Sequence, residues 1–164
     1  MIERLVLFGA TGDLAGRFLL PALAALHAAG EIPSGFRVVA AAREELDDEA
    51  YQRSAAERLA QHARGVPAES RTALIRSLRY RRADVADPAS VAPLIDDEPS
   101  AFYLALPPSV FAPAVTALHR AGLPAGSRIV FEKPFGEDLE SAAELNALLA
   151  DSFGADAERM ASGC

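Results

Sequence analysis

The sequence lacks several patterns on which whole classes of proteins depend. Cysteine occurs once, at Cys164, so no disulfide forms within the chain and a reducing compartment is expected. The three histidines, His27, His62 and His119, fall on separate predicted helices without the spacing of metal ligands, so we expect no metal site. Apolar runs are too short for a membrane span or a signal peptide. These absences indicate a cytoplasmic protein.

Positively charged residues are also fewer than negatively charged ones. The chain has 16 Lys and Arg against 23 Asp and Glu, a net charge of −7. Binding to nucleic acid or to a membrane surface favours basic patches, so we expect neither. At 164 residues with 51% hydrophobic residues, the chain is long enough for one domain with a core. We expect this domain at residues 1–153 and an irregular tail, without periodicity, at 154–164.

Short apolar runs alternate with longer helical patterns along the chain. The runs predict strands at 4–8, 37–42, 79–83, 100–105 and 127–132. Helices are predicted at 13–29, 47–64, 68–77, 87–96, 109–121 and 138–152, with boundaries marked by Gly30, Gly122 and Asp87 before Pro88. Continuously apolar strands that alternate with helices are typical of a parallel sheet covered on both faces. The predicted fold class is α/β, a single doubly wound parallel sheet of the Rossmann type.

A glycine turn lies between the first predicted strand and the first predicted helix. It reads Gly9-Ala10-Thr11-Gly12-Asp13-Leu14-Ala15. Glycine lets the backbone turn tightly and approach a ligand, and the free N–H groups at a helix start attract an anion. The spacing differs from the dinucleotide pattern G-x-G-x-x-G, because Leu7 takes the place of the first glycine. We predict a phosphate-binding turn, with an ordinary tight turn as the alternative.

Arg43 follows the second predicted strand directly. In a Rossmann sheet an acidic residue at this place holds the ribose 2′-hydroxyl of NAD, and an arginine accommodates the 2′-phosphate of NADP. Arg43 therefore favours NADP, although an ordinary surface arginine is the alternative. Glu44 and Glu45 come next and leave dual specificity with NAD open.

The fourth and fifth predicted strands also end in unusual residues. Pro107 and Pro108 follow the fourth strand and force the chain out of the sheet at the edge where ligands bind. The fifth strand runs into Glu132, Lys133 and Pro134. A lysine at this edge can hold an anion or hydrogen-bond a reacting hydroxyl, and a solvated Glu-Lys pair is the alternative.

Together, these segments resemble the amino-terminal coenzyme domain of glucose-6-phosphate dehydrogenase over about residues 4–153. The resemblance implies an NADP-linked oxidation of glucose 6-phosphate to 6-phosphogluconolactone, in the pentose phosphate pathway. It implies coenzyme contacts from Gly9, Ala10, Thr11, Gly12, Asp13, Leu14, Arg43, Leu106, Pro107, Phe111, Glu132 and Lys133. It also implies that Lys133 lies between nicotinamide and sugar in the catalytic site, with a cis peptide bond to Pro134.

The chain departs from the family pattern at three places. Gly16 stands where the family usually has Lys or Arg, and Phe111 stands where Tyr is common. The Arg-Ile-Asp-His-Tyr-Leu-Gly-Lys segment that binds the sugar phosphate has no match, since Met160 and Ala161 follow Arg159. We therefore expect this chain alone to bind coenzyme without efficient turnover, and to use glucose 6-phosphate only if a second domain or chain completes the site.

Two other functional classes share features with this sequence. A non-catalytic NAD(P)-binding regulatory module or degenerate paralogue remains the main alternative. A short-chain dehydrogenase is disfavoured because that class needs Tyr-x-x-x-Lys, and none of the three tyrosines has a lysine four residues later. An apolar surface that normally faces another domain also predicts self-association.

Overall fold

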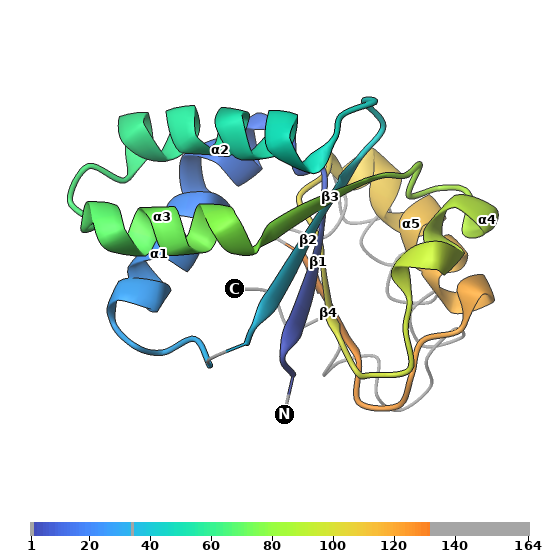
Figure 1. The fold of residues 1–164 in the computed structure, drawn as a ribbon. Helices are drawn as coiled ribbons and strands as arrows, with labels where there is room; N and C mark the ends of the chain where they lie inside the picture. Colours follow the sequence, from blue (N-terminus) through green and yellow to red (C-terminus); the bar gives the residue numbers. More distant parts are fainter. Residues whose placement is uncertain (1, 34, 132–164) are drawn as a thin grey trace.

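Five parallel strands form the centre of the computed structural model, which describes residues 2–33 and 35–131 (Figure 1). They are β1 (Arg4–Phe8), β2 (Arg37–Ala42), β3 (Leu78–Arg82), β4 (Ala101–Leu104) and β5 (Arg128–Phe131). Their order in the sheet is β3-β2-β1-β4-β5, and every neighbouring pair is parallel. The direction of winding reverses between β1 and β4, which confirms the predicted doubly wound α/β fold.

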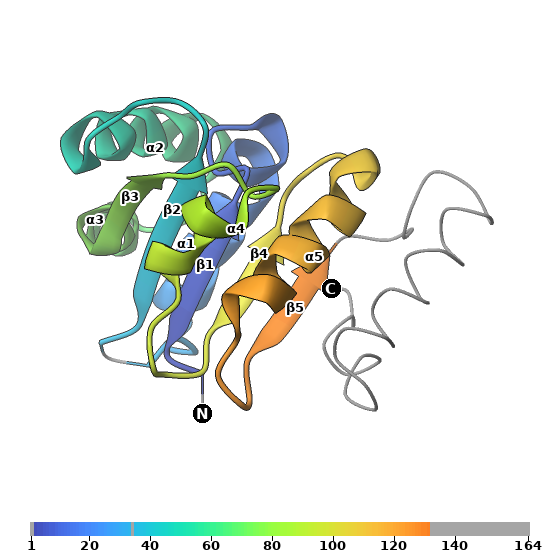
Figure 2. The same ribbon diagram turned by 90° about the vertical axis from the view of Figure 1, so that its right-hand side faces the viewer.

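Helices cover both faces of this sheet. The first face carries the turn η1 (Ala15–Leu19) with α1 (Leu20–Ala28), α2 (Asp48–His62) and α3 (Ala68–Ser77). Short helices α4 (Pro88–Val91) and η2 (Ala92–Leu94), then η3 (Pro108–Val110) and α5 (Phe111–Ala121), follow on the other side. Figures 1 and 2 show α1 to α3 on one side of the strands and α4 and α5 on the opposite side.

The alternation of side chains along the strands divides the core into two layers. Val6 and Phe8 of β1 are buried among the side chains of α5, β4 and β5. Leu7, between them, is buried with residues of α1, α2 and α3 on the other face. Because β1 is buried on both faces, its sequence is a continuous apolar run, which explains why the run predicts a central parallel strand.

Each predicted strand is confirmed, with ends that differ by at most one residue. The predicted start of a helix at Asp87-Pro88 is confirmed, because the Asp87 carboxylate accepts a hydrogen bond from the Ala89 N–H at 3.1 Å. Gly122 ends α5 with a φ of +82°. The first helix differs from expectation only in beginning with a π-helical turn, η1. The predicted helix at 138–152 and the tail at 154–164 lie outside the described residues.

The described part of the chain bears on two of the predicted absences. None of its helices combines the length and apolar character needed to cross a membrane. Its His, Cys, Asp and Glu side chains form no group of three or more that could hold a metal ion.

Candidate functional site

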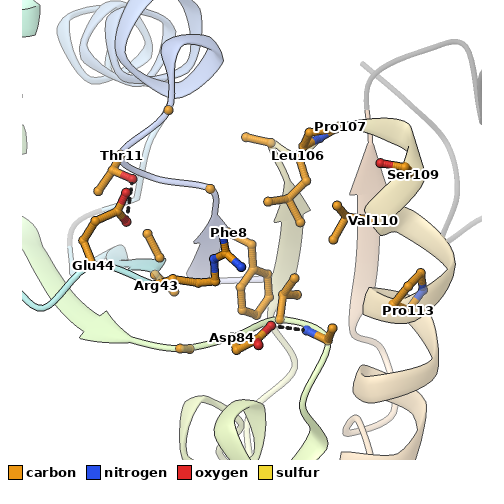
Figure 3. Close-up of a pocket in the computed structure, with 18 residues that line it drawn as sticks. Phe8, Thr11, Arg43, Glu44, Asp84, Leu106, Pro107, Ser109, Val110 and Pro113 are labelled. Carbon is orange, nitrogen blue, oxygen red and sulfur yellow. Dashed lines mark hydrogen bonds between the residues drawn. The ribbon is translucent and has the colours of Figure 1, made fainter.

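A pocket of about 550 Å³ opens at the carboxyl edge of the sheet, where β1 and β4 lie side by side (Figure 3). The glycine turn supplies Gly9, Thr11 and Gly12, and the segment after β2 supplies Arg43 and Glu44. The other walls come from the ends of β3 and β4 and the start of α5: Ala83, Asp84, Val85, Ala86, Ala105, Leu106, Pro107, Ser109, Val110 and Pro113. A crevice at the point where strand order reverses is where ligands bind in open α/β sheets.

Gly9 shapes this pocket because it has no side chain. Its φ is +76°, in the region that side chains disfavour, and a Cβ atom at this position would overlap the carbonyl oxygen of Ala105 beyond β4. The Gly12 N–H closes the turn on the Gly9 carbonyl at 3.0 Å. The backbone of the turn therefore packs directly against the backbone at the end of β4. The turn then leads into the first helix. N–H groups in a first helical turn lack partners within the helix and favour an anion there.

Two stacked tyrosines, Tyr51 and Tyr80, hydrogen-bond to the backbone of the glycine turn and of the segment after β2. The Tyr51 hydroxyl donates to the Ala10 carbonyl at 3.0 Å, and the Tyr80 hydroxyl donates to the Glu44 carbonyl at 2.6 Å. Their ring centroids are 5.3 Å apart. Burial raises the pKa of Tyr51 above its ordinary value, and burial with the nearby Glu44 charge raises the pKa of Tyr80. Both hydroxyls therefore stay protonated and able to donate.

Arg43 and Glu44 are neighbours in sequence, but their side chains make different contacts. The Glu44 carboxylate accepts a hydrogen bond from the Thr11 hydroxyl at 2.9 Å and so joins the β2 end to the glycine turn. Arg43 extends into the pocket beside Phe8 (Figure 3), and within residues 2–33 and 35–131 its side chain has no hydrogen-bond or ion-pair partner. The pocket thus receives an uncommitted guanidinium from Arg43.

The predicted departure at Gly16 has a counterpart in the structure. The Arg58 side chain of α2 lies over Gly16, and a Cβ added there would be 2.5 Å from Arg58 Nη1. The same Nη1 lies 3.7 Å from Asp13 Oδ1, which also pairs with Arg17 Nε at 3.0 Å. Arg58 therefore takes the space beside the glycine turn that a side chain at position 16 would otherwise enter.

The structure brings together half of the residues that the sequence predicted as coenzyme contacts. Those that line the pocket are Gly9, Thr11, Gly12, Arg43, Leu106 and Pro107. Ala10, Asp13 and Leu14 belong to the turn but do not line the pocket. Phe111 is 2% exposed and packs on Phe131 at 5.0 Å between ring centroids, so its ring lies in the core. Glu132 and Lys133 lie outside the described residues.

Sequence reasoning missed the part of the pocket that follows β3. Asp84 lines the pocket there, with Ala83, Val85 and Ala86. Arg43 lies one residue beyond the end of β2 and Asp84 lies two residues beyond the end of β3, and the last residues of these strands, Ala42 and Arg82, are paired in the sheet. The rule that selected Arg43, that polar residues at parallel strand ends reach the ligand edge, selects Asp84 equally once the weak third strand is accepted.

Comparison with known proteins shows the same family along nearly the whole chain. The family described as glucose-6-phosphate dehydrogenase, NAD binding domain, matches residues 6–157. Glucose-6-phosphate 1-dehydrogenase of Zymomonas mobilis is 34% identical over 154 residues, which cover 88% of this chain and 32% of the relative. The Mycolicibacterium smegmatis enzyme of the same name is 35% identical over 161 residues, covering 90% of this chain and 32% of the relative.

Solved structures agree with the sequence comparison. The crystal structure of glucose-6-phosphate 1-dehydrogenase from Mycobacterium avium matches with a TM-score of 0.85 and 33% identity, over 95% of this chain and 35% of that one. A glucose-6-phosphate dehydrogenase in complex with its substrate glucose 6-phosphate matches with a TM-score of 0.84 and 26% identity, over 99% and 36% of the two chains. The chain thus spans about a third of the length of the relatives it matches.

Proposed function

The chain belongs to the family of glucose-6-phosphate dehydrogenase NAD-binding domains, and we propose that it forms the NADP-binding part of such an enzyme. The observation that carries this proposal is the pocket at the β1–β4 crevice, which joins a glycine turn to an uncommitted arginine. An extended dinucleotide needs both features, because its pyrophosphate sits at a helix start and its ribose reaches the end of the second strand.

We expect three parts of the coenzyme to bind at three different places in the pocket. The pyrophosphate is expected at the turn Gly9–Gly12, where the backbone can approach closely. The 2′-phosphate is expected at Arg43, which favours NADP over NAD, while Glu44 at the same rim allows some NAD binding. The nicotinamide is expected toward Leu106 and Pro107, on the side of β4 that faces β5 and the segment leading to Lys133.

Oxidation of glucose 6-phosphate needs a base to take the hydroxyl proton as hydride leaves for the coenzyme. The three histidines of the sequence lie in the last turns of α1, α2 and α5, at the helix ends that are remote from the carboxyl edge of the sheet, where the pocket opens. None of them lines the pocket. We therefore propose that this chain binds coenzyme and that a second domain or chain supplies the base and the sugar-phosphate site.

A non-catalytic NAD(P)-binding regulatory module is the second candidate function. It is favoured by the position of the histidines and by Gly16, which has no cationic side chain of its own at a place where the family usually has Lys or Arg. Lys133 argues for the enzyme, because a lysine between nicotinamide and sugar has no use in a module that only binds. The two candidates therefore differ in whether Lys133 contacts a sugar phosphate.

Titration with NADP and NAD tests the coenzyme proposal directly. We expect micromolar NADP binding that Arg43→Ala weakens by roughly ten- to a hundredfold, the value of a charge-assisted hydrogen bond lost. Arg53→Ala is the matched control, because Arg53 is exposed on α2 and pairs with Glu49 at 3.5 Å, outside the pocket. Absence of binding to either coenzyme by the unmodified chain would overturn the proposal.

Lys133 permits a second test because it is the single lysine of the sequence. A lysine-directed reagent labels this side chain and the chain's α-amino group alone, and mass spectrometry separates the two. Protection of Lys133 by NADP, increased by glucose 6-phosphate, would support the enzyme candidate. Protection by NADP without any effect of the sugar phosphate, together with no turnover, would support the binding module.

Three further expectations belong to this proposal. We propose that the coenzyme unit extends over residues 1–153, that the protein acts in the cytoplasm, and that it serves the pentose phosphate pathway.

Phe18, Leu26 and Leu46 are large apolar side chains that are exposed in the described structure, and Phe18 is 63% exposed. They fit the expected self-association, which sizing at increasing concentration would measure and a constant monomer mass would contradict.

A further inference from the structure

We propose that Arg82 joins Arg43 to form a two-guanidinium site for the 2′-phosphate of NADP, with the Ser90 hydroxyl as a third donor. This inference rests on the proposed function, since it names a specificity-determining residue for the same coenzyme. Arg82 and Ser90 do not line the main pocket and were not singled out by the sequence, which points to Arg43 alone.

The two arginines meet because the strands that carry them are neighbours. Ala42 of β2 pairs with Arg82 of β3, so Arg43 comes one residue beyond the register partner of Arg82. Arg82 Nε donates a hydrogen bond to the Arg43 carbonyl at 3.0 Å. Both residues line a second cavity of about 390 Å³ with Ala83, Asp84 and Ser90, and three of these five residues also line the main pocket. The second cavity is thus a side extension of the coenzyme pocket.

Neither guanidinium has a carboxylate partner among the described residues. Their neighbours behave differently: Arg81 Nη1 lies 3.3 Å from Asp48 Oδ1, and Arg79 Nε lies 4.0 Å from Asp48 Oδ2. Arginine carries five N–H donors, and Arg82 uses one of them on the Arg43 carbonyl, so about four remain for a ligand. Both guanidinium groups are therefore available to an anion that enters the cavity they line.

The acidic residues at this rim explain why one arginine is insufficient. Glu44 and Asp84 both line the main pocket, so Arg43 alone faces two carboxylates. Glu44 is bound to the Thr11 hydroxyl, and Asp84 Oδ1 accepts from the Ala86 N–H at 3.0 Å. Each carboxylate therefore has a neutral donor as its partner, and among the described residues neither forms an ion pair with Arg43 or Arg82. Arg82 adds the second positive charge that a phosphate dianion needs at a rim of this composition.

Ser90 completes the donor set from α4. Its Oγ accepts a hydrogen bond from the Asp84 N–H at 2.8 Å, which leaves the hydroxyl proton free to donate. The cavity therefore presents a planar fork from each arginine and one hydroxyl, an arrangement that suits a phosphate monoester. NAD carries a hydroxyl in place of this phosphate, so Arg82 is expected to act on NADP and to have little effect on NAD.

The test compares Arg82→Gln with Arg81→Gln, an adjacent change of the same kind whose partner is Asp48. Dissociation constants for NADP, NAD, 2′,5′-ADP and 5′-AMP are measured on the full chain by calorimetry. For Arg82→Gln we expect NADP and 2′,5′-ADP to bind roughly ten- to a hundredfold more weakly, with NAD and 5′-AMP changed less than about threefold. Arg81→Gln is expected to change none of the four by more than about threefold.

Arg82→Lys separates charge from backbone positioning, because it keeps the cation and loses the Nε–H bond to the Arg43 carbonyl. We expect it to retain more NADP affinity than Arg82→Gln. An equal loss for NADP and NAD in Arg82→Gln, or no loss for either, would overturn the two-arginine site. If the unmodified chain prefers NADP and only Arg43→Ala removes that preference, this inference fails and the proposed function stands. If the unmodified chain binds no coenzyme, both fail.

Discussion

The Tyr51 hydroxyl donates a hydrogen bond to the carbonyl of Ala10, across a sequence separation of 41 residues. Its ring stacks on Tyr80, whose hydroxyl donates to the Glu44 carbonyl. One aromatic pair therefore fixes the glycine turn and the segment after β2, which are the two backbone segments that bring Gly12 and Arg43 to the pocket. Neither tyrosine lines the main pocket, so each affects a ligand only through the backbone it holds.

Removal of the Tyr51 hydroxyl is expected to loosen the glycine turn. Tyr51→Phe leaves the buried Ala10 carbonyl without its donor, which costs about 1–3 kcal/mol of the free energy of unfolding. Coenzyme binding should weaken for NADP and NAD alike, because we propose that both place their pyrophosphate at this turn. Denaturant unfolding and calorimetry measure the two effects. Tyr80→Phe is the control: it should affect the Glu44 segment, and a larger loss of NAD affinity than in Tyr51→Phe would contradict this assignment.

The same tyrosines give the protein a predicted sensitivity to alkaline pH. Burial raises the pKa of Tyr51 and of Tyr80 in the folded state, whereas in the unfolded chain a tyrosine titrates near about 10. Above that pH the unfolded state releases protons that the folded state keeps, so the free energy of unfolding falls as pH rises. Urea unfolding between pH 8 and pH 11 measures the decline. Tyr51→Phe should flatten it, and an unchanged slope would contradict the prediction.

Gly9 is expected to tolerate no side chain. Gly9→Ala combines a positive φ with overlap of the Ala105 carbonyl oxygen, a backbone atom that cannot turn aside, and should cost more than about 2 kcal/mol of stability. Gly30→Ala is the matched control, since Gly30 has a φ of +72° and open space where a Cβ would lie. It should cost only about 1 kcal/mol. Equal losses in thermal unfolding would show that the contact with Ala105 is unimportant.

Gly16 is expected to accept alanine, in contrast to Gly9. The atoms nearest to an added Cβ belong to the Arg58 side chain, whose end can move at little cost. Alanine also raises helix propensity, so Gly16→Ala should change stability by less than about 1 kcal/mol in either direction. Gly16→Ala with Arg58→Ala should be at least as stable as Arg58→Ala alone. A loss above about 2 kcal/mol in both backgrounds would mean that the backbone itself needs glycine here.

The fold was predictable because apolar runs mark the central strands and because glycine, proline and aspartate mark most boundaries. That Gly9, Gly12 and Arg43 lie at one pocket was predictable for the related reason that parallel strand ends share one edge. Tyr51 was not, since a hydrogen bond to a carbonyl 41 residues away leaves no local pattern. Phe111 shows the limit for helices: its rotation about the helix axis decides between pocket and core, and packing on Phe131 places it in the core.

The pocket walls come from segments as far apart in sequence as Phe8 and Pro113, and the glycine turn rests on the chain just beyond β4. More than about a hundred residues must therefore leave the ribosome before all the walls of the pocket are present. In the function proposed above, NADP cannot guide the early collapse of the nascent chain, because the pocket is complete only once β4 and the start of α5 have been made. A bound coenzyme would instead stabilise the folded domain by RT ln(1 + [L]/Kd), so that its concentration would set part of the free energy of unfolding.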